Sequence, residues 1–161
     1  MKVIFCLLAI FSVAAAKPKT LSELGLQPFA DGQYLLSSFI SSWVDASNFC
    51  KSIGCALADV TTEDEHLLLT SVYASSIPDR VWIGGTDLGT EGNFYWGQSL
   101  EDFSADVNLT FWHAGEPSGV TLHGIPEHCV QYRRFNGALL WNDAPCENEY
   151  QFICEVKPSV C

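Results

Sequence analysis

Residues 112–143 read WHAGEPSGVTLHGIPEHCVQYRRFNGALLWND, and several oxygen-bearing side chains lie along this stretch. A carboxylate stands next to a proline near its start. A second carboxylate lies close to a cysteine in its middle, and an adjacent amide and carboxylate follow a tryptophan at its end. Such oxygens in loops are the ligands that calcium prefers, so the stretch predicts a site for a hard cation. The candidate ligands are Glu116, Ser118, Glu127, Asn142 and Asp143.

Ahead of this stretch, residues 1–16 have the pattern of a secretory signal peptide. Lys2 supplies the positive charge, residues 3–13 are almost wholly apolar, and three alanines at 14–16 fit the cleavage pattern. The apolar run is too short to span a bilayer, and a buried N-terminal helix is the alternative. No later stretch reaches the apolar length of a membrane span. We therefore expect residues 17–161 to form a free, secreted chain without membrane insertion.

The number of cysteines is also typical of a secreted protein. Removal of the signal segment removes Cys6 and leaves an even number of cysteines, which in a secreted chain is typical of a disulfide framework with three bridges. Spacing alone does not select a pairing. Zinc ligation by cysteine is the alternative, but no C-x-x-C spacing is present. The remaining cysteines are Cys50, Cys55, Cys129, Cys146, Cys154 and Cys161.

The composition is strongly acidic. There are 8 Lys and Arg against 19 Asp and Glu, for a formal net charge of −11, and without Lys2 the balance is 7 against 19, or −12. Nucleic acid and anionic lipid surfaces are poor partners for such a chain. The pair Arg133-Arg134 is too small a patch to indicate a polyanion partner. Because acidity often reflects surface solvation alone, only the arrangement of the carboxylates can indicate a cation site.

The first part of the mature chain is predicted to form a strand and then a helix. Residues 17–31 carry two prolines and no clear period, and we interpret them as an N-terminal arm. Residues 32–41 are aromatic and apolar enough for a strand. A helix is predicted over Trp43–Ile53, because Ser42 stands at the N-cap and apolar residues recur at helical spacing up to Gly54.

A second helix is predicted from the capping box at 62–65 up to Pro78. Beyond Arg80 the pattern changes to short strands and long loops. A strand, two helices and a run of strands predict a single α+β domain over residues 32–161. The predicted core face of the second helix is Leu67, Leu68, Val72 and Tyr73. The later strands are expected at 81–84, 93–96, 129–132, 139–141 and 151–156.

Residues 87–126 contain only one expected strand. A loop of this length in a compact domain is normally either disordered or functional. Disordered segments are poor in aromatic residues, whereas this one is rich in them. We therefore expect an ordered long loop with a small core of its own. Its aromatic residues include Phe94, Tyr95, Trp96, Phe103, Phe111 and Trp112.

Five short motifs occur together in one order: WIGG at 82–85, GEPS at 115–118, EHC at 127–129, WND at 141–143 and FICE at 152–155. In this order and at this spacing they resemble a C-type lectin domain. The resemblance covers about residues 32–156, and the run TDLGTEGNFYW at 86–96 looks most like secreted single-domain arthropod members.

The resemblance implies a fold with two helices, two small antiparallel sheets and a long ordered loop, stapled by disulfides. It also implies how the cysteines pair. The third implied bridge departs from the commoner layout, whose extra pair lies before the first helix. The implied bridges are Cys50–Cys154, Cys129–Cys146 and Cys55–Cys161.

The resemblance further implies that the five oxygen-bearing residues bind Ca²⁺, with the Asp143 carbonyl as another ligand and a cis Glu116-Pro117 bond. Two neighbouring hydroxyls of a hexose would complete the calcium shell. The order of the tripeptide resembles the family's EPN type, which favours mannose, fucose, glucose and N-acetylglucosamine, whereas the QPD type favours galactose. Ser118 departs from EPN because a hydroxyl is shorter than an amide. We therefore expect weaker or broader sugar selectivity.

Three other interpretations of these residues are open. The chain could have kept the fold and lost the site. Three histidines in the stretch could indicate zinc, although so many oxygens fit calcium better. Four tryptophans could stack on sugar, although their motif positions favour the core. These residues are His113, His123 and His128, and Trp82, Trp96, Trp112 and Trp141.

Glu116, Glu127 and Asp143 could also serve as the acid and base of a glycosidase. Carboxylates committed to a cation are poor proton donors, and the family that the chain resembles is non-catalytic. We therefore do not expect an enzyme.

The sequence thus predicts a secreted, calcium-dependent lectin that binds microbial or cell-surface glycans in innate immune recognition, a role that rests on the resemblance. The alternative is a calcium-independent module that binds a protein or a surface without sugar. Agglutination would require a homo-oligomer, and no heptad or collagen-like segment is present to form one. Asn108 begins an N-glycosylation sequon.

Overall fold

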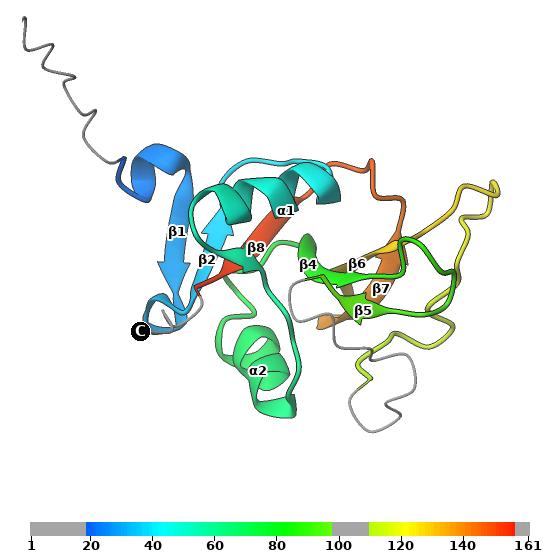
Figure 1. Ribbon diagram of the computed structural model, residues 1–161. Helices are drawn as coiled ribbons and strands as arrows, with labels where there is room; N and C mark the ends of the chain where they lie inside the picture. Colours follow the sequence, from blue (N-terminus) through cyan, green and yellow to red (C-terminus); the bar gives the residue numbers. More distant parts are fainter. Residues whose placement is uncertain (1–18, 98–109, 157–161) are drawn as a thin grey trace, which may run out of the picture.

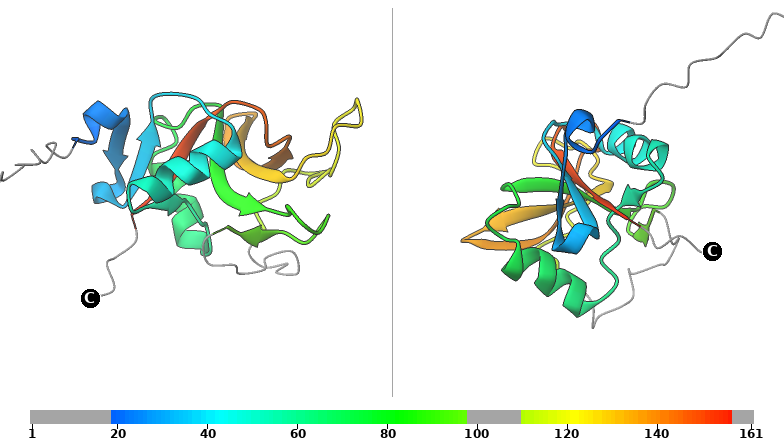
Figure 2. Two further views of the ribbon diagram at one scale, coloured as in Figure 1. Left: turned by 45° about the horizontal axis from the view of Figure 1, so that its top comes forward. Right: turned by 90° about the vertical axis from the view of Figure 1, so that its left-hand side faces the viewer.

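The computed structural model describes residues 19–97 and 110–156, so residues 1–16, Asn108 and Cys161 lie outside it. Two helices lie on different sides of a set of strands (Figures 1 and 2), and the α+β class predicted from the sequence is confirmed. The helices are α1 (Trp43–Ser52) and α2 (Glu63–Leu67), and α2 continues into a π-helical turn, η3 (Leu68–Val72). The strands are β1 (Leu26–Phe29), β2 (Tyr34–Ser37), β3 (Ala56–Leu57), β4 (Arg80–Thr86), β5 (Tyr95–Trp96), β6 (Cys129–Phe135), β7 (Ala138–Ala144) and β8 (Gln151–Glu155).

The strands form two antiparallel groups, β1-β2-β8 and β4-β6-β7. A parallel pairing of β4 with β8 joins the groups, with Val81 opposite Gln151 and Trp82 opposite Phe152. The two sheets implied by the resemblance are therefore connected into one mixed sheet in the order β1-β2-β8-β4-β6-β7. Strand β1 lies within the segment interpreted as an arm. The sequence analysis did not predict this strand, although Leu26 is buried in it.

Helix α1 begins where the sequence predicts it. The side chain of Ser42 accepts a hydrogen bond from Asp45 N (3.2 Å), which satisfies one of the free N–H groups of the first turn. Trp43 and Cys50 are buried on its inner face, and the Trp43 Nε1 donates to Ile83 O (2.8 Å). Helix α1 is thus fixed to strand β4, which precedes the long loop.

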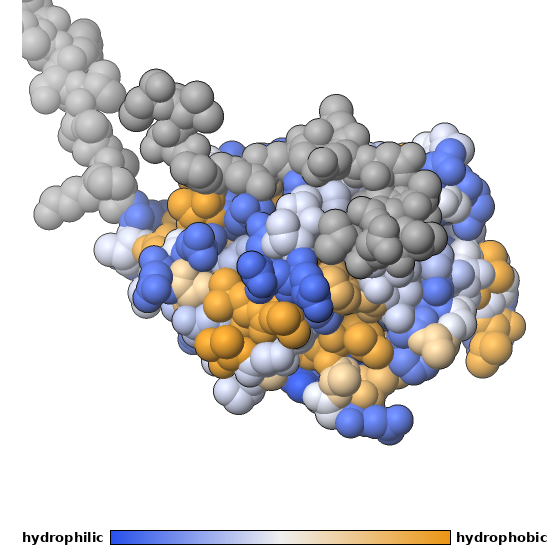
Figure 3. Space-filling model, turned by 90° about the horizontal axis from the view of Figure 1, so that it is seen from below, coloured by the Kyte–Doolittle hydropathy of each residue, from blue (hydrophilic) through white to orange (hydrophobic). Residues whose placement is uncertain are grey.

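Helix α2 has the predicted capping box, and its predicted core face is right only in part, because Leu68 and Tyr73 pack against the core. His66 and Leu69 are buried, whereas Leu67 and Val72 are 47% and 66% exposed, so their assignment to the core was wrong. The polar His66 is tolerated inside because its ring stacks on Phe111 at 3.7 Å and its Nδ1 lies 2.9 Å from Tyr132 Oη. Burial lowers the pKa of His66 to about 4. Figure 3 shows apolar residues on the lower face of the molecule, which is the side on which α2 lies in Figure 1.

The aromatic residues of the long region join the main core. Phe94 and Trp96 are buried in the same cluster as Trp141, and Phe111 and Trp112 pack against that cluster. The expectation of a separate small core was therefore wrong for the described residues, and Phe103 lies outside them. Trp141 is fully buried and meets Trp96, Phe111 and Trp112 edge to face at 5.2–5.7 Å. Two parts of the long region, at Trp96 and at Phe111-Trp112, thus pack on Trp141 of β7.

The described residues contain two disulfides, Cys50–Cys154 between α1 and β8, and Cys129–Cys146 between β6 and the turn after β7. These are two of the pairs that the resemblance implied. Cys55 has no disulfide partner among the described residues, and the implied pair with Cys161 stays a prediction. No helix in the described ranges is long and apolar enough to cross a membrane.

Candidate functional site

The loop between Trp112 and Glu127 forms one wall of an open hollow beside β7. It is the yellow segment that projects from the strands in Figure 1. The hollow has a volume of about 480 Å³ and brings together four of the five predicted cation ligands. The fifth, Asp143, is fully buried. The four predicted residues that line the hollow are Glu116, Ser118, Glu127 and Asn142.

Backbone contacts hold the start of this loop against β7. Trp141 N donates to Phe111 O (2.7 Å), and His113 N donates to Trp141 O (2.9 Å). Glu116 N then donates to His113 O (2.9 Å), and the Glu116-Pro117 peptide bond is cis. These contacts place Glu116 beside the residues that follow Trp141 in the strand.

The buried carboxylate of Asp143 accepts two hydrogen bonds from the same loop. Ser118 N donates to Oδ1 (3.0 Å), and Gly119 N donates to Oδ2 (2.7 Å). A carboxylate has about four lone-pair sites, so these bonds leave each oxygen able to accept a further partner. Asp143 therefore fixes the position of the loop, which is a function that the sequence analysis did not assign to it.

The other side chains of the hollow are linked in pairs. Ser118 Oγ donates to Glu127 Oε2 (2.9 Å), and Arg133 Nη1 donates to Asn142 Oδ1 (3.2 Å). Asn142 Nδ2 donates to the main-chain carbonyl of Asp143. The hydroxyl of Ser118 therefore uses its one proton on Glu127, and the amide oxygen of Asn142 already accepts from a cationic group.

Glu116 differs from its neighbours because its Oε2 is buried and has no hydrogen-bond partner among the described residues. The pKa of Glu116 is raised to about 7, first by burial and then by the carboxyls of Asp143 and Glu127, against the opposing effect of Ser118. Burial also raises the pKa of Glu127, and Ser118 and Arg133 oppose that rise. The carboxyl groups of Glu116 and Glu127 thus both have raised pKa values, and one of them has a buried oxygen without a partner among the described residues. A divalent cation bound between them would stabilise their ionised forms.

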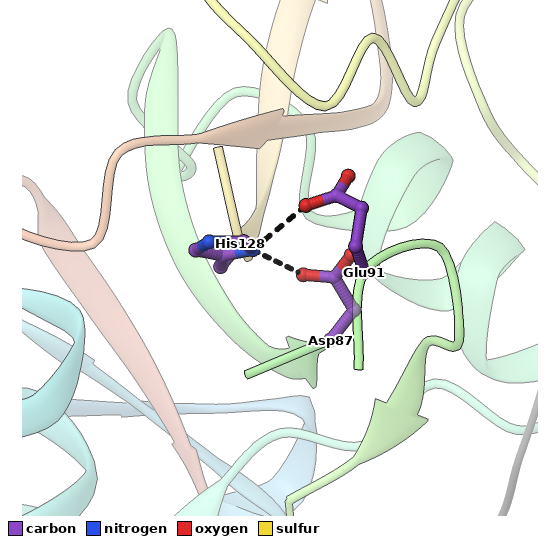
Figure 4. Close-up of side chains that lie close together, drawn as sticks. All are labelled: Asp87, Glu91 and His128. Atoms are coloured by element: carbon purple, nitrogen blue, oxygen red, sulfur yellow. Dashed lines mark hydrogen bonds and ion pairs between the residues drawn. The ribbon is translucent and has the colours of Figure 1, made fainter. Parts of the chain in front are cut away.

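A second group of titratable side chains lies behind the loop. His128 Nδ1 lies 2.9 Å from Asp87 Oδ1 and 3.4 Å from Glu91 Oε2 (Figure 4). Asp87 is fully buried and also accepts from Gly92 N (2.7 Å). The sequence analysis missed this group because Asp87 and His128 are far apart along the chain. They meet through the pairing of β4 with β6, in which Thr86 lies opposite Cys129.

This second group supports the loop at Gly119. A Cβ at Gly119 would lie 2.7 Å from Glu91 Oε1, and the φ of Gly119 is +73°, a left-handed value that favours glycine. The backbone of the loop therefore approaches the Glu91 carboxylate closely. Glu127 N also donates to Gly119 O (2.9 Å), so the position of Gly119 affects that of Glu127 at the end of the loop.

The three histidines of the zinc interpretation are not brought together. His113 stacks on Phe135 at 3.6 Å, His123 is exposed on the loop, and His128 pairs with the two carboxylates behind it. Among the described residues, the three side chains of Figure 4 are the only group of three or more His, Cys, Asp or Glu residues whose potential ligand atoms lie within 4.8 Å of one another. The buried Trp82, Trp96 and Trp141 belong to the core, as predicted.

The lectin C-type domain family model matches residues 40–156 of the chain. The chain belongs to the C-type lectin family. The C-type lectin domain family 4 member K of Mus musculus is 35% identical over 131 residues, which cover 81% of this chain. The mannose-binding isoform of a C-type lectin from Notechis scutatus scutatus is 30% identical and covers 77% of this chain and 76% of its own length.

Among solved structures, the trimeric structure of the Kupffer cell C-type lectin receptor Clec4f has a TM-score of 0.67 at 28% identity and covers 88% of both chains. The resemblance inferred from the five motifs is therefore confirmed. The lectin domains of this family are non-enzymatic, which agrees with the expectation that the chain is not an enzyme. This chain spans only 37% of the mouse family 4 member K, so the activity of that longer protein is not assigned to it here.

Proposed function

We propose that the lectin domain is a secreted, calcium-dependent carbohydrate-binding protein that takes mannose-type sugars in the hollow beside β7. The single observation that carries this proposal is the buried Oε2 of Glu116, which has no hydrogen-bond partner among the described residues and lies in a hollow with further carboxylates. Leaving such an atom unpartnered costs free energy, and a cation would remove that cost. The mannose-binding name of the snake relative supports the class of ligand.

The candidate ligands are Glu116, Ser118, Glu127, Asn142 and Asp143. Calcium, when bound, would supply coordination positions for two neighbouring sugar hydroxyls. Glu116 and Glu127 would accept the protons of those hydroxyls, because their carboxylates line the hollow. Asn142 would offer its amide oxygen to the ion, and Asp143 would hold the loop through its two backbone hydrogen bonds.

Ser118 sets the expected selectivity. An asparagine at this position could donate an amide proton to a sugar oxygen. Ser118 has one proton, and that proton is donated to Glu127. The sugar therefore loses one donor, and we expect affinities below those of a site with the full EPN motif. The acid-first order still favours mannose, fucose and N-acetylglucosamine over galactose.

Binding of microbial or cell-surface glycans in innate immune recognition is the role we propose for such a site. Homo-oligomers would be needed for agglutination, because one domain holds one sugar weakly. The trimeric state of the Clec4f structure supports testing oligomerisation here.

Isothermal titration calorimetry of residues 17–161 tests the proposal. Calcium should bind, and methyl α-mannoside should bind only in calcium and better than methyl α-galactoside, with no binding in chelator. The alternative is a calcium-independent module for a protein or a surface, which is favoured by the existing partners of Ser118 and Asn142. That alternative would be supported if the protein bound neither calcium nor sugar.

A further inference from the structure

Adjacent arginines of strand β6 are used in different ways. Successive side chains of a strand point to opposite faces, so Arg133 and Arg134 are separated. Arg134 donates to Asp79 Oδ1 and to the carbonyl oxygens of Ala74, Ile77 and Gly137, at 2.9–3.2 Å. Its guanidinium is therefore nearly saturated by the protein, and Arg134 has a structural function.

Arg133 has far fewer partners. Its Nη1 donates to Asn142 Oδ1 (3.2 Å), and this is its one hydrogen bond to the described residues. A guanidinium carries five N–H donors in a planar fork, so most of the donors of Arg133 are available to a ligand. The contrast with Arg134 shows that this availability is particular to the position of Arg133 at the hollow.

Aromatic rings hold the guanidinium of Arg133 in place. The guanidinium carbon lies 4.8 Å from the centroid of Phe135, and Phe135 stacks on His113 at 3.6 Å. Stacking on a ring restrains a planar guanidinium and leaves its edge free for hydrogen bonds. Arg133 is therefore a restrained cation with free donors in the wall of the hollow that contains Glu116, Ser118 and Glu127.

The charges of the hollow also accommodate a negative ligand. The carboxylates of Glu116, Glu127 and Asp143 carry three negative charges when ionised. A divalent cation and Arg133 together carry three positive charges. The loaded site would then be neutral with Arg133 and negative without it, so only the arginine form avoids repulsion of an anionic group at this place.

We propose that the hollow selects sugars that carry an oxyanion, a sulfate ester or a carboxylate, and that Arg133 binds this group while the sugar hydroxyls occupy the cation site. This inference rests on the proposed calcium-dependent sugar binding. A guanidinium fork matches two oxygens of a sulfate or carboxylate, and such charge-assisted pairs are about twice as strong as neutral hydrogen bonds. Arg133 thereby becomes the specificity-determining residue of the hollow.

The test compares N-acetylglucosamine, its 6-sulfate and glucuronic acid by calorimetry in calcium, with chelator as the blank. The wild-type protein should bind one or both anionic sugars about tenfold more tightly than the neutral one. The Arg133→Gln variant should lose this preference, because it lacks the guanidinium fork, and the preference is taken as the ratio of its affinities for the anionic and the neutral sugar. The Lys51→Gln variant removes an exposed cation on α1, away from the lining of the hollow, with the same change in net charge, and should keep the preference.

Three results would overturn the assignment. The first is equal binding of neutral and anionic sugars by the wild-type protein, and the second is an unchanged preference in Arg133→Gln. The third is a loss of calcium binding and of neutral-sugar binding in Arg133→Gln, which would make Arg133 only a support for Asn142. Binding of the neutral sugar reports on the proposed function by itself. Its absence from the wild-type protein would reject that function and this inference with it, whereas its presence without selectivity would reject this inference alone.

Discussion

Ser118 Oγ donates a 2.9 Å hydrogen bond to Glu127 Oε2, so the loop and the far wall of the hollow are linked through one proton. Replacing Ser118 with asparagine should strengthen calcium-dependent binding of methyl α-mannoside about three- to tenfold, because an amide carries two donors and can reach both Glu127 and the sugar. Calorimetry in calcium measures this, and Ser118→Ala, which removes the proton, should bind no better than the wild-type protein. Equal affinity for Ser118→Asn would show that position 118 does not govern sugar binding.

Glu116 and Asp143 should differ in what their removal does without calcium. Asp143→Ala leaves Ser118 N and Gly119 N without their acceptor, so stability in chelator should fall by about 1–3 kcal/mol. Glu116→Ala removes the Oε2 atom, which has no hydrogen-bond partner among the described residues. This variant therefore leaves no backbone N–H group without its acceptor, and stability in chelator should not fall for that reason.

Both variants should lose the stabilisation that calcium gives, which would be about 2.7 kcal/mol at a concentration a hundredfold above the Kd. Thermal denaturation with and without calcium makes the comparison. Retention of the calcium shift by either variant would show that the residue is not part of the cation site.

The raised pKa of Glu116 predicts an unusual pH profile in chelator. Its pKa is raised from 4.5 to about 7, so between these values the folded protein holds a proton that the unfolded chain has lost. The contribution of Glu116 to stability is therefore complete below pH 4.5 and is lost as the pH rises through about 7. The Tm of the wild-type protein minus the Tm of Glu116→Gln should therefore fall as the pH rises from 4.5 to about 7. A difference that does not change with pH would contradict the assignment.

Calcium should alter that profile in a defined way. Since only the ionised carboxylate binds the ion, calcium affinity should increase as the pH rises from 5 to 7.5. The gap between Tm in calcium and Tm in chelator should widen over the same range. Calorimetric titrations with calcium at several pH values provide the independent measurement, and a constant affinity would count against Glu116 as a ligand.

Gly119 offers a test of how the second carboxylate group supports the site. Gly119→Ala places a Cβ 2.7 Å from Glu91 Oε1 and also strains a φ of +73°. Gly124→Ala is the matched control, because its φ is +75° and nothing lies within 4 Å of the added Cβ. Both should lose about 1 kcal/mol of stability from the backbone strain.

Only Gly119→Ala should also weaken calcium and sugar binding, by a small factor, because the added Cβ displaces the end of the Glu91 side chain beside the loop. Combining it with Glu91→Ala should restore part of that binding, since the clash disappears while the strain remains. Equal loss of binding in the Gly119 and Gly124 variants would show that the contact with Glu91 is unimportant for the site.

Local signals in the sequence predicted several parts of the fold correctly. Ser42 and the Thr62–Glu65 capping box predicted where both helices start, because an N-cap depends on residues only three apart. The core face of the second helix was predicted only in part, because Leu68 and Tyr73 pack against the core whereas Leu67 and Val72 are exposed. An apolar Leu67 was preferred to a polar His66, and the partners that make His66 acceptable inside, Tyr132 and Phe111, come from distant parts of the chain.

By itself, the sequence determined the α+β class, the family and the group of oxygen-bearing residues between Glu116 and Asp143, because motif order and spacing carry that information. Only the tertiary structure decided what those residues contact. The loop meets β7 through backbone hydrogen bonds, and the β4–β6 pairing brings Asp87 to His128. The alternation of β6 turns Arg133, but not Arg134, into the hollow. Such contacts depend on strand pairing over long separations, which no local pattern in the chain encodes.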